Sequence, residues 1–454
     1  MDRGPLNMKT TRLVTAAVLI GLCGYAWYST VSTYMDIKTQ RASVEATAND
    51  FMERRLYQLA FKNYREACAL QGVEDPDPAL YKAELDAAKA FYQEEPEEGV
   101  ELMETAYEDL RTVFPDQPFV WEESIQFQID REKVSEAGKL LRKANLQGVK
   151  SEKLEIQKQQ LYYLYSGIAL NYEYIDNISY DGYYRAHDRS EYSLISSADG
   201  SEVLSLELPY MGPVGEKGMV VCRTEDGEAI LYTPDGVKRA RFYADFEEAM
   251  AVGNGMVPLK KPGNAGWTFY DARGNEVKGG FEAVSMFQNG AAFVKPAGQP
   301  WTLMNQQGQL ANISFEDVRM AENGSFLNNG VMLVKRDGQW MIADMTGAPV
   351  SDFRCDDIDI NLGQPIAFRR GEKWGFVKSD GTVYMEPCFE EARSFSGAVA
   401  AVKQGGSWGY ISPSGNVEVD CSFVDAGYFN NAGTCSVKRE GDRPWRLIKW
   451  VVDR

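Results

Sequence analysis

The stretch AVAAVKQGGSWGYISPSGN, residues 398–416, decides the fold. Apolar residues lie on both sides of a glycine pair, a pattern typical of two short β-strands joined by a tight turn. Trp408 opens the second strand, and Gly415 follows it seven residues later. Glycine adopts the positive φ that tight turns require, so this stretch predicts a β-hairpin followed by a second turn.

The same pattern recurs along the C-terminal part of the chain. Its clearest other copies are PIAFRRGEKWGFVKSDGT (365–382) and GVMLVKRDGQWMIADMTGA (330–348). The residue that opens the second strand marks eight units, spaced 34 to 39 residues apart: Tyr192, Ala229, Trp267, Trp301, Trp340, Trp374, Trp408 and Trp445. A glycine follows seven residues after six of these positions and eight residues after Tyr192. This internal repeat predicts an all-β repeat domain, which we place at residues 172–454.

Most units also end in a short motif with an aromatic residue, an acidic residue and a small or apolar close. The copies are FEEA (246–249), FEAV (281–284), FEDV (315–318), FEEA (389–392) and FVDA (423–426). This motif adds a further strand, so each unit can hold up to four short strands. Cys355, Cys388 and Cys421 recur just before it, which indicates packing positions instead of a redox site.

These residues resemble the bacterial WG-repeat family, which is named after a Trp-Gly pair. The pair stands here at Trp374-Gly375 and Trp408-Gly409, and the resemblance extends over about 280 residues. Four copies depart from it, because other residues replace the family glycine: Thr268, Thr302, Met341 and Arg446. The resemblance implies a repeat architecture and an envelope or surface setting. It implies no enzymatic activity, since no common catalytic function comes with that family.

Four short strands in each unit predict a β-propeller of about eight four-stranded blades. The motif YIDNI (174–178) precedes the first unit, whereas the eighth unit stops after residues 445–452. An N-terminal strand is therefore expected to complete the C-terminal blade, which removes open sheet edges that promote aggregation. An open β-solenoid is the alternative.

Residues 36–170 predict an all-α module. Apolar residues lie three and four positions apart, as in KVSEAGKLLRKA (133–144), which is typical of amphipathic helices. Trp121 is followed 16 and 23 residues later by Ala137 and Ala144, a spacing similar to that of tetratricopeptide repeats, in which small residues let two helices cross closely. A generic helical bundle is the alternative, because Ile125 and Gln128 replace the usual Gly and Tyr of that repeat.

The N-terminus predicts the compartment. Arg3, Lys9 and Arg12 precede the uncharged run 13–31, and its 19 residues would span about 28 Å as a helix, close to the thickness of a bilayer core. We therefore expect a cytoplasmic tail at residues 1–12, a transmembrane helix in the lipid bilayer at 13–34, and an extracytoplasmic bulk on a bacterial cell membrane. Secretion after cleavage near Ala26 is the alternative.

Composition excludes several classes of function. The net charge of -18 repels phosphate backbones, so we expect no nucleic-acid partner. His187 is the only histidine and no C-x-x-C pair occurs, which argues against a metal site or a His-dependent triad. No phosphate-binding loop, dinucleotide fingerprint or hydrolase motif is present. We therefore predict no catalytic, cofactor-binding or metal-ligating residues and no cofactor.

Two groups of carboxylates are the remaining candidates for chemistry. Asp357, Asp359 and Asn361 alternate like the start of a calcium loop, but position 368, where a bidentate glutamate is needed, is a phenylalanine, which favours a strand. The pairs Glu247-Glu248 and Glu390-Glu391 recur at equivalent positions, which favours solvated strand residues over catalysis.

The recurring tryptophans suit either sugar-stacking platforms or packing between repeat units. Recurrence once per repeat favours packing.

These observations predict a membrane-anchored extracytoplasmic binding or scaffold protein, not an enzyme, whose repeat domain recognises a protein or a cell-envelope glycan. The alternative is a polysaccharide hydrolase in the propeller channel. That enzyme would need two carboxylates, each unique to its repeat unit, facing one cavity at a separation of roughly 5 to 9.5 Å. A third possibility is that the helical module recognises the partner.

Overall fold

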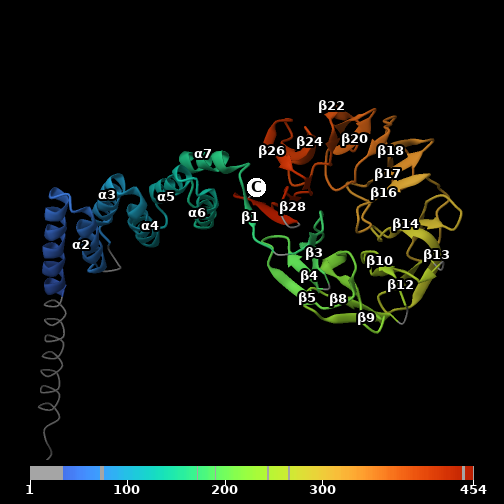
Figure 1. Ribbon diagram of the computed structural model, residues 1–454, viewed down its shortest axis with the longest axis horizontal. Helices are drawn as coiled ribbons and strands as arrows, with labels where there is room; N and C mark the ends of the chain where they lie inside the picture. The colour runs from blue at the N-terminus through green and yellow to red at the C-terminus, as the bar shows by residue number, and fades with distance from the viewer. Residues whose placement is uncertain are drawn as a thin grey trace, which may run out of the picture. The chain divides into compact units, whose positions relative to one another are not determined.

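The computed structural model describes residues 34–71, 76–170, 172–189, 191–242, 245–263, 266–441 and 445–452 (Figure 1). The chain divides between Gln159 and Gln160 into a helical unit and a β unit.

The helical unit begins with a helix at residues 34–53. The further helices are α2 (Tyr57–Ala69), α3 (Pro78–Glu94), α4 (Pro96–Val113), α5 (Pro118–Asp130), α6 (Val134–Leu146) and α7 (Glu152–Leu161). Proline occupies the first position of α3, α4 and α5, where its missing N–H costs nothing. Each of these prolines therefore marks the start of a helix.

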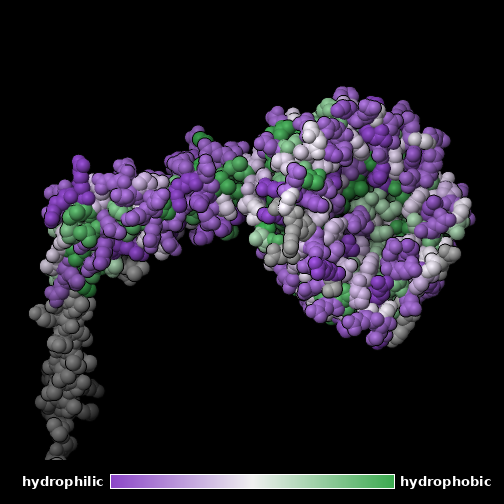
Figure 2. Space-filling view, in the orientation of Figure 1, coloured by the Kyte–Doolittle hydropathy of each residue, from purple (hydrophilic) through white to green (hydrophobic). Residues whose placement is uncertain are grey.

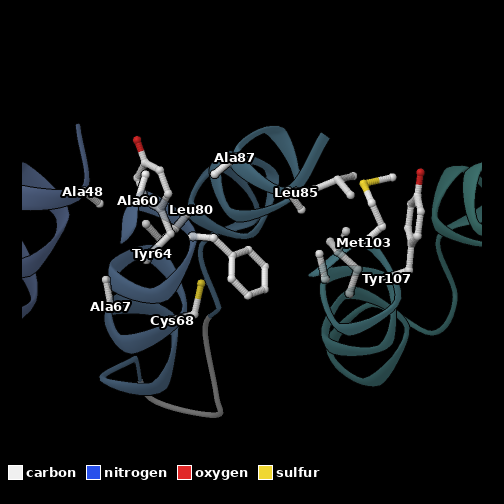
Figure 3. Packing of buried hydrophobic residues seen from close by; sticks show 14 of the residues in the cluster. Ala48, Ala60, Tyr64, Ala67, Cys68, Leu80, Leu85, Ala87, Met103 and Tyr107 are labelled. Carbon is white, nitrogen blue, oxygen red and sulfur yellow. The ribbon is translucent and has the colours of Figure 1, made fainter. Parts of the chain in front are cut away.

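Small residues bring the helices of this unit together. Ala60, Ala67 and Ala87 are fully buried beside larger side chains such as Tyr64 and Met103 (Figure 3). In the pair α5 and α6, Trp121, Ala137 and Ala144 are buried, as their spacing predicts. Similarity of this segment to tetratricopeptide repeats stays a prediction.

The expected membrane anchor is corrected. Within the part of the chain that the structure describes, no helix is both long and apolar enough to cross a bilayer. The expected span at 13–34 lies outside the described residues except for Tyr34, which begins the first described helix. The prediction of a single-pass membrane localisation is therefore not supported.

In the β unit, antiparallel strands form sheets that stand around a ring (Figure 1). The first sheet contains β2 (Tyr174–Ile175), β3 (Tyr183–Asp188), β4 (Glu191–Ser196) and β5 (Glu202–Leu206). The second contains β6 (Tyr210–Met211), β7 (Val220–Arg223), β8 (Ala229–Tyr232) and β9 (Lys238–Phe242). The third contains β10 (Glu248–Ala249), β11 (Met256–Lys260), β12 (Trp267–Asp271), β13 (Glu276–Val284), β14 (Ala291–Pro296) and β15 (Thr302–Asn305).

The remaining sheets complete the ring. The fourth contains β16 (Asp317–Arg319), β17 (Val331–Arg336) and β18 (Gln339–Asp344). The fifth contains β19 (Asp357–Ile358), β20 (Ile366–Arg370), β21 (Lys373–Val377) and β22 (Val383–Phe389). The sixth contains β23 (Glu391–Ala392), β24 (Ala400–Gln404), β25 (Ser407–Ile411) and β26 (Val417–Phe423). The seventh contains β27 (Asp425–Ala426), β28 (Thr434–Lys438), β29 (Arg446–Trp450) and β1 (Tyr165–Ile168).

The propeller therefore has seven sheets in the described residues, and the expectation of eight four-stranded blades is wrong. The physical reason is β13, which runs without interruption from one repeat unit into the next. Its Phe281 pairs with Trp267 of β12, whereas its Ala283 pairs with Lys295 of β14. Two repeat units thus share one six-stranded sheet.

The ring is closed, which rules out the open solenoid. β1 pairs with β29 in the register Tyr165 to Trp450, so a strand from before the first repeat completes the last sheet. The motif YIDNI does not supply this strand, because its Tyr174 and Ile175 form β2 of the first sheet. The seven turn glycines that the repeat predicts all have positive φ: Gly200, Gly236, Gly274, Gly308, Gly347, Gly381 and Gly415.

The strand that contains the acidic motif lies nearest the centre of the ring, as β10 and β16 do, whereas β5, β9 and β22 lie on its rim (Figure 1). We call the segment that joins this innermost strand to the second strand the linker. In the visible face of the ring, hydrophobic residues show near the centre, whereas the rim is largely hydrophilic (Figure 2).

Candidate binding site

The first carboxylate of the repeated acidic motif holds the hairpin of its own unit. In five units it accepts a hydrogen bond from a backbone N–H in the turn between the second and third strands. The pairs are Glu247 with Gly263, Glu282 with Gly298, Glu316 with Gly338, Asp356 with Gly371, and Glu390 with Gly405. These backbone hydrogen bonds lower the pKa of Glu282 and Glu390. The repeated position therefore serves the turn.

The second carboxylate faces a base on the neighbouring strand. Glu248 accepts a hydrogen bond from Lys260 at 2.8 Å, and Glu391 accepts one from Lys403 at 2.6 Å. In five units a Lys or Arg faces an acidic residue across these strands, in the pairs Glu248 with Lys260, Asp317 with Lys335, Asp357 with Arg369, Glu391 with Lys403, and Asp425 with Lys438. Cross-strand pairs of opposite charge stabilise a sheet by about 0.2–1 kcal/mol each. Pairing of strands accounts for this position without catalysis.

The tryptophans do not form open stacking platforms. Trp267, Trp301, Trp340 and Trp408 are only 4% to 8% exposed, and Trp374 is partly buried. Guanidinium groups cover two of the rings, with Arg319 4.5 Å from the ring centre of Trp340 and Arg393 4.7 Å from that of Trp408. The packing interpretation of the repeated tryptophan agrees with this geometry.

The three residues that resemble a calcium loop bind protein groups. Asp357 pairs with Arg319, and Asp359 accepts hydrogen bonds from Ser394 N and the Tyr428 hydroxyl. The Asn361 amide donates to two backbone carbonyls. Across the described ranges, no group of three His, Cys, Asp or Glu side chains is placed to hold a metal ion.

His187 lies on β3 between two tyrosine rings. The ring centres of Tyr174 and Tyr192 are each 5.1 Å from the imidazole. Burial lowers the pKa of His187, which favours the neutral imidazole. The histidine packs within the first sheet and meets no acid–base partner in this contact.

One carboxylate pair in the centre of the ring approaches what the hydrolase alternative needs. Asp176 Oδ1 and Glu322 Oε1 lie 2.9 Å and 3.5 Å from the same Arg185 Nη2, and burial raises the pKa of Asp176 to about 6. The cavity beside them holds about 10 Å³, which is the space of a single water molecule. A sugar ring does not fit there, so this geometry does not support the hydrolase.

A larger hollow of about 400 Å³ lies where the linkers of the first, fifth, sixth and seventh sheets meet, and we call it the closure hollow. Its lining is Ile178, Ser179, Asp181, Gly182, Ser197, Leu362, Ser396, Tyr428, Phe429, Asn430, Asn431 and Ala432. Ile178 and Leu362 are its partly exposed apolar residues, whereas Phe429 lies buried behind it. Ser179, Asp181, Ser396 and Asn431 add hydroxyl, amide and carboxylate groups.

Asn430 holds the hollow together at the ring closure. Its amide nitrogen donates to Ser179 Oγ at 3.0 Å, Tyr184 Oη at 3.1 Å and Thr434 Oγ1 at 2.8 Å. Its amide oxygen accepts from the backbone N–H groups of Ala432 and Thr434. One side chain thus joins the first and seventh sheets and fixes the walls of the closure hollow.

The sequence pattern does not reveal the closure hollow, because nearly all of its residues lie in linkers. The repeat is defined by residues of the strands and their turns. The only signal in the sequence is that the linkers differ from one unit to the next.

The comparison with protein families names the repeat. The model described as "WG containing repeat" matches residues 374–408 and 408–441, which begin at the repeated tryptophans Trp374 in β21 and Trp408 in β25. This part of the chain consists of WG repeats. The two matched WG repeats span the fifth to seventh sheets.

The comparison with solved structures finds proteins with weak similarity to this chain. BamB from Moraxella catarrhalis is 13% identical with a TM-score of 0.42, covering 63% of this chain and 96% of that one. A eukaryotic initiation factor is 13% identical at 0.40, covering 63% and 87%, and Hsv2 from Kluyveromyces lactis is 9% identical at 0.35, covering 60% and 96%. A comparison with curated proteins gives no match. At these TM-scores the similarity supports no conclusion about this chain, and the propeller architecture follows from its own strand pairing.

Proposed function

We propose that the chain is a protein-binding scaffold, not an enzyme, and that the closure hollow holds a segment of its partner. The observation that carries this proposal is a concave hollow of about 400 Å³ in which Ile178 and Leu362 lie partly exposed among hydroxyl, amide and carboxylate groups. Its volume falls within the range of about 300–1,000 Å³ that is typical of ligand sites. An apolar side chain with its flanking backbone suits this combination of surfaces.

A protein partner is favoured over a glycan. Sugar recognition relies on aromatic faces that are open to solvent, and the repeated tryptophans are buried. Tyr428 is also buried, with its hydroxyl engaged by Asp359. Hydroxyl and amide groups on the hollow suit the peptide backbone, which presents both donors and acceptors.

The test uses the full chain with a photo-cross-linking residue at Leu362, expressed in cells of its source. The matched control carries the same residue at Val350, which is exposed on the outer side of the fourth sheet. We expect a protein adduct at 362 that is missing at 350. A purified adduct partner should then bind Leu362→Glu at least about tenfold more weakly than the parent, a loss of about 1.4 kcal/mol, and should bind Val350→Glu like the parent.

Equal adducts at both positions, or unchanged affinity of Leu362→Glu, would overturn the proposal. Sedimentation of the parent with insoluble envelope polysaccharide, reduced by Leu362→Glu, would instead assign the closure hollow to a glycan.

A second candidate lies in the helical unit. A groove of about 680 Å³ runs between α3, the end of α4 and the start of α5. Phe119 is 47% exposed at this groove, and Lys89 pairs with Glu123 there at 2.6 Å. A cross-linking residue at Phe119 is therefore the third arm of the experiment, and an adduct only there would move partner recognition to the helices.

A further inference from the structure

One linker of the ring is longer than all the others. Between the innermost and second strands, the linkers of seven repeat units have six to eight residues, whereas the linker between β16 and β17 has eleven. Its last six residues, SFLNNG (325–330), correspond in length and ending to SMFQNG (285–290) of the neighbouring unit. Residues 320–324, MAENG, are therefore the excess.

The excess residues form a turn of their own. Gly324 N donates to Ala321 O, and Ala321 N donates to Ser325 O, both at 2.8 Å. The Asn323 side-chain oxygen accepts from Ser325 N at 3.0 Å. These local bonds make the segment a compact element that projects from the fourth sheet.

This turn touches the first, second and third sheets, of which only the third is a neighbour of its own sheet. Glu322 accepts a hydrogen bond from the Tyr174 hydroxyl at 3.3 Å and lies 3.5 Å from Arg185 Nη2, both in the first sheet. The Asn323 amide donates to Val214 O, in the linker of the second sheet, at 3.5 Å. Gly324 O accepts from Met286 N of the third sheet at 3.2 Å. The segment thus crosses the centre of the ring.

Close packing accompanies these hydrogen bonds. A Cβ atom at Gly324 would lie 2.6 Å from Met286 N and 2.7 Å from Met250 Cγ, so only glycine fits between the third sheet and the turn. Val214, beneath Asn323, is 2% exposed.

We infer that residues 320–324 are a plug that closes the central channel and braces the fourth sheet against the first three. The channel is then neither a passage nor a ligand site. The two faces of the ring become separate surfaces, and a partner in the closure hollow has no access to the opposite face. This inference does not depend on which partner the hollow binds.

The test measures how fast a thiol beneath the plug reacts. The test uses the full chain with Cys388→Ser and Cys421→Ser, which removes the two exposed or partly exposed cysteines among the described residues, and with Cys23→Ser, which removes the cysteine outside them. In this background Val214→Cys is labelled with a small maleimide. We expect deletion of residues 320–324 to raise the labelling rate at least about tenfold, because burial of a reactive group suppresses its reaction. Asn289→Cys, in an exposed turn, should react at the same rate with and without the plug.

The same rate for Val214→Cys in a folded deletion variant would overturn the inference. If the deletion variant lacks the circular dichroism of the parent, Glu322→Ala with Asn323→Ala replaces it, since these changes remove the cross-ring hydrogen bonds and keep the chain length. That double variant should label Val214→Cys at least about threefold faster than the parent, and an unchanged rate would again reject the plug.

Discussion

The Tyr428 hydroxyl lies 2.9 Å from both carboxylate oxygens of Asp359. Tyr428 belongs to the linker of the seventh sheet and Asp359 to that of the fifth, so this hydrogen bond bypasses the sixth sheet. Burial raises the pKa of both groups. Buried polar groups need hydrogen-bond partners, so this contact between the fifth and seventh sheets stabilises the closed ring.

Removal of this hydroxyl should destabilise the β unit. We expect Tyr428→Phe to lower the free energy of unfolding by about 1–3 kcal/mol, because Asp359 loses a hydrogen bond in a buried place. Tyr384→Phe is the control, since that exposed hydroxyl donates to Pro413 O at the surface and should cost less than about 0.5 kcal/mol. Urea unfolding followed by tryptophan fluorescence measures both, and equal losses would contradict the role of the buried bond.

Two glycines with positive φ allow the cost of backbone strain to be measured separately from the cost of a steric clash. Gly324 has φ +85° and no space for a Cβ, whereas Gly330 has φ +74° and open space around it. Gly330→Ala should cost about 1–2 kcal/mol from backbone conformation alone. Gly324→Ala should cost a further 1–3 kcal/mol, roughly the penalty of overpacking. Thermal unfolding measures the stability of the two variants. If Gly324→Ala is as stable as Gly330→Ala, the turn accommodates the added methyl group without a clash.

The helical unit should lose stability as pH rises. Glu84 on α3 is 1% exposed, and burial raises its pKa from 4.5 to about 8. The folded state therefore keeps a proton that the unfolded state loses above pH 4.5. The resulting stability is complete below 4.5 and is lost as pH rises towards 8, with a slope of up to about 1.4 kcal/mol per pH unit.

Glu84→Gln should remove this slope, because the amide stays neutral at every pH. Denaturant unfolding at pH 5 and pH 8, followed by helical circular dichroism, gives the comparison. Glu101→Gln on the exposed side of α4 is the matched control and should keep the slope. If Glu84→Gln keeps the full dependence of stability on pH, that dependence arises from another titratable group.

The hairpin turns should loosen in acid. Hydrogen bonds from Gly406 and Gly405 lower the pKa of Glu390, so their stabilising effect is present above the unfolded pKa and is lost as pH falls through the lower folded value. Glu390→Ala should speed hydrogen exchange at Gly405 and Gly406 at neutral pH, whereas Asp420→Ala on β26 should leave it unchanged. Exchange mass spectrometry of this turn measures the effect, and equal rates in the two variants would contradict it.

The repeat, its turn glycines and its strand order could be predicted from sequence because each depends on local chemistry. Gly381 and Gly415, for example, need only their own turns to fix their φ. The sheet count could not be predicted, since the merger through β13 depends on whether pairing continues past Phe281 into the next unit. Sequence spacing is the same in either case.

Most of the candidate site could not be predicted from sequence, because the linkers that form it do not repeat. Asn430 and Ser179 meet at the ring closure although they are 251 positions apart, and no spacing rule connects them. The plug left one trace, the five additional residues between Arg319 and Ser325. Linker lengths compared across units would have found it.

The pairing of β1 with β29 also orders events during synthesis. β29 leaves the ribosome about 280 residues after β1, which takes on the order of tens of seconds at about 5–20 residues per second. During that interval β1 exists without its partner, and the first six sheets can form only as an open arc. Completion of the ring therefore waits for β29, and until then the nascent chain carries β1 as an unpaired strand.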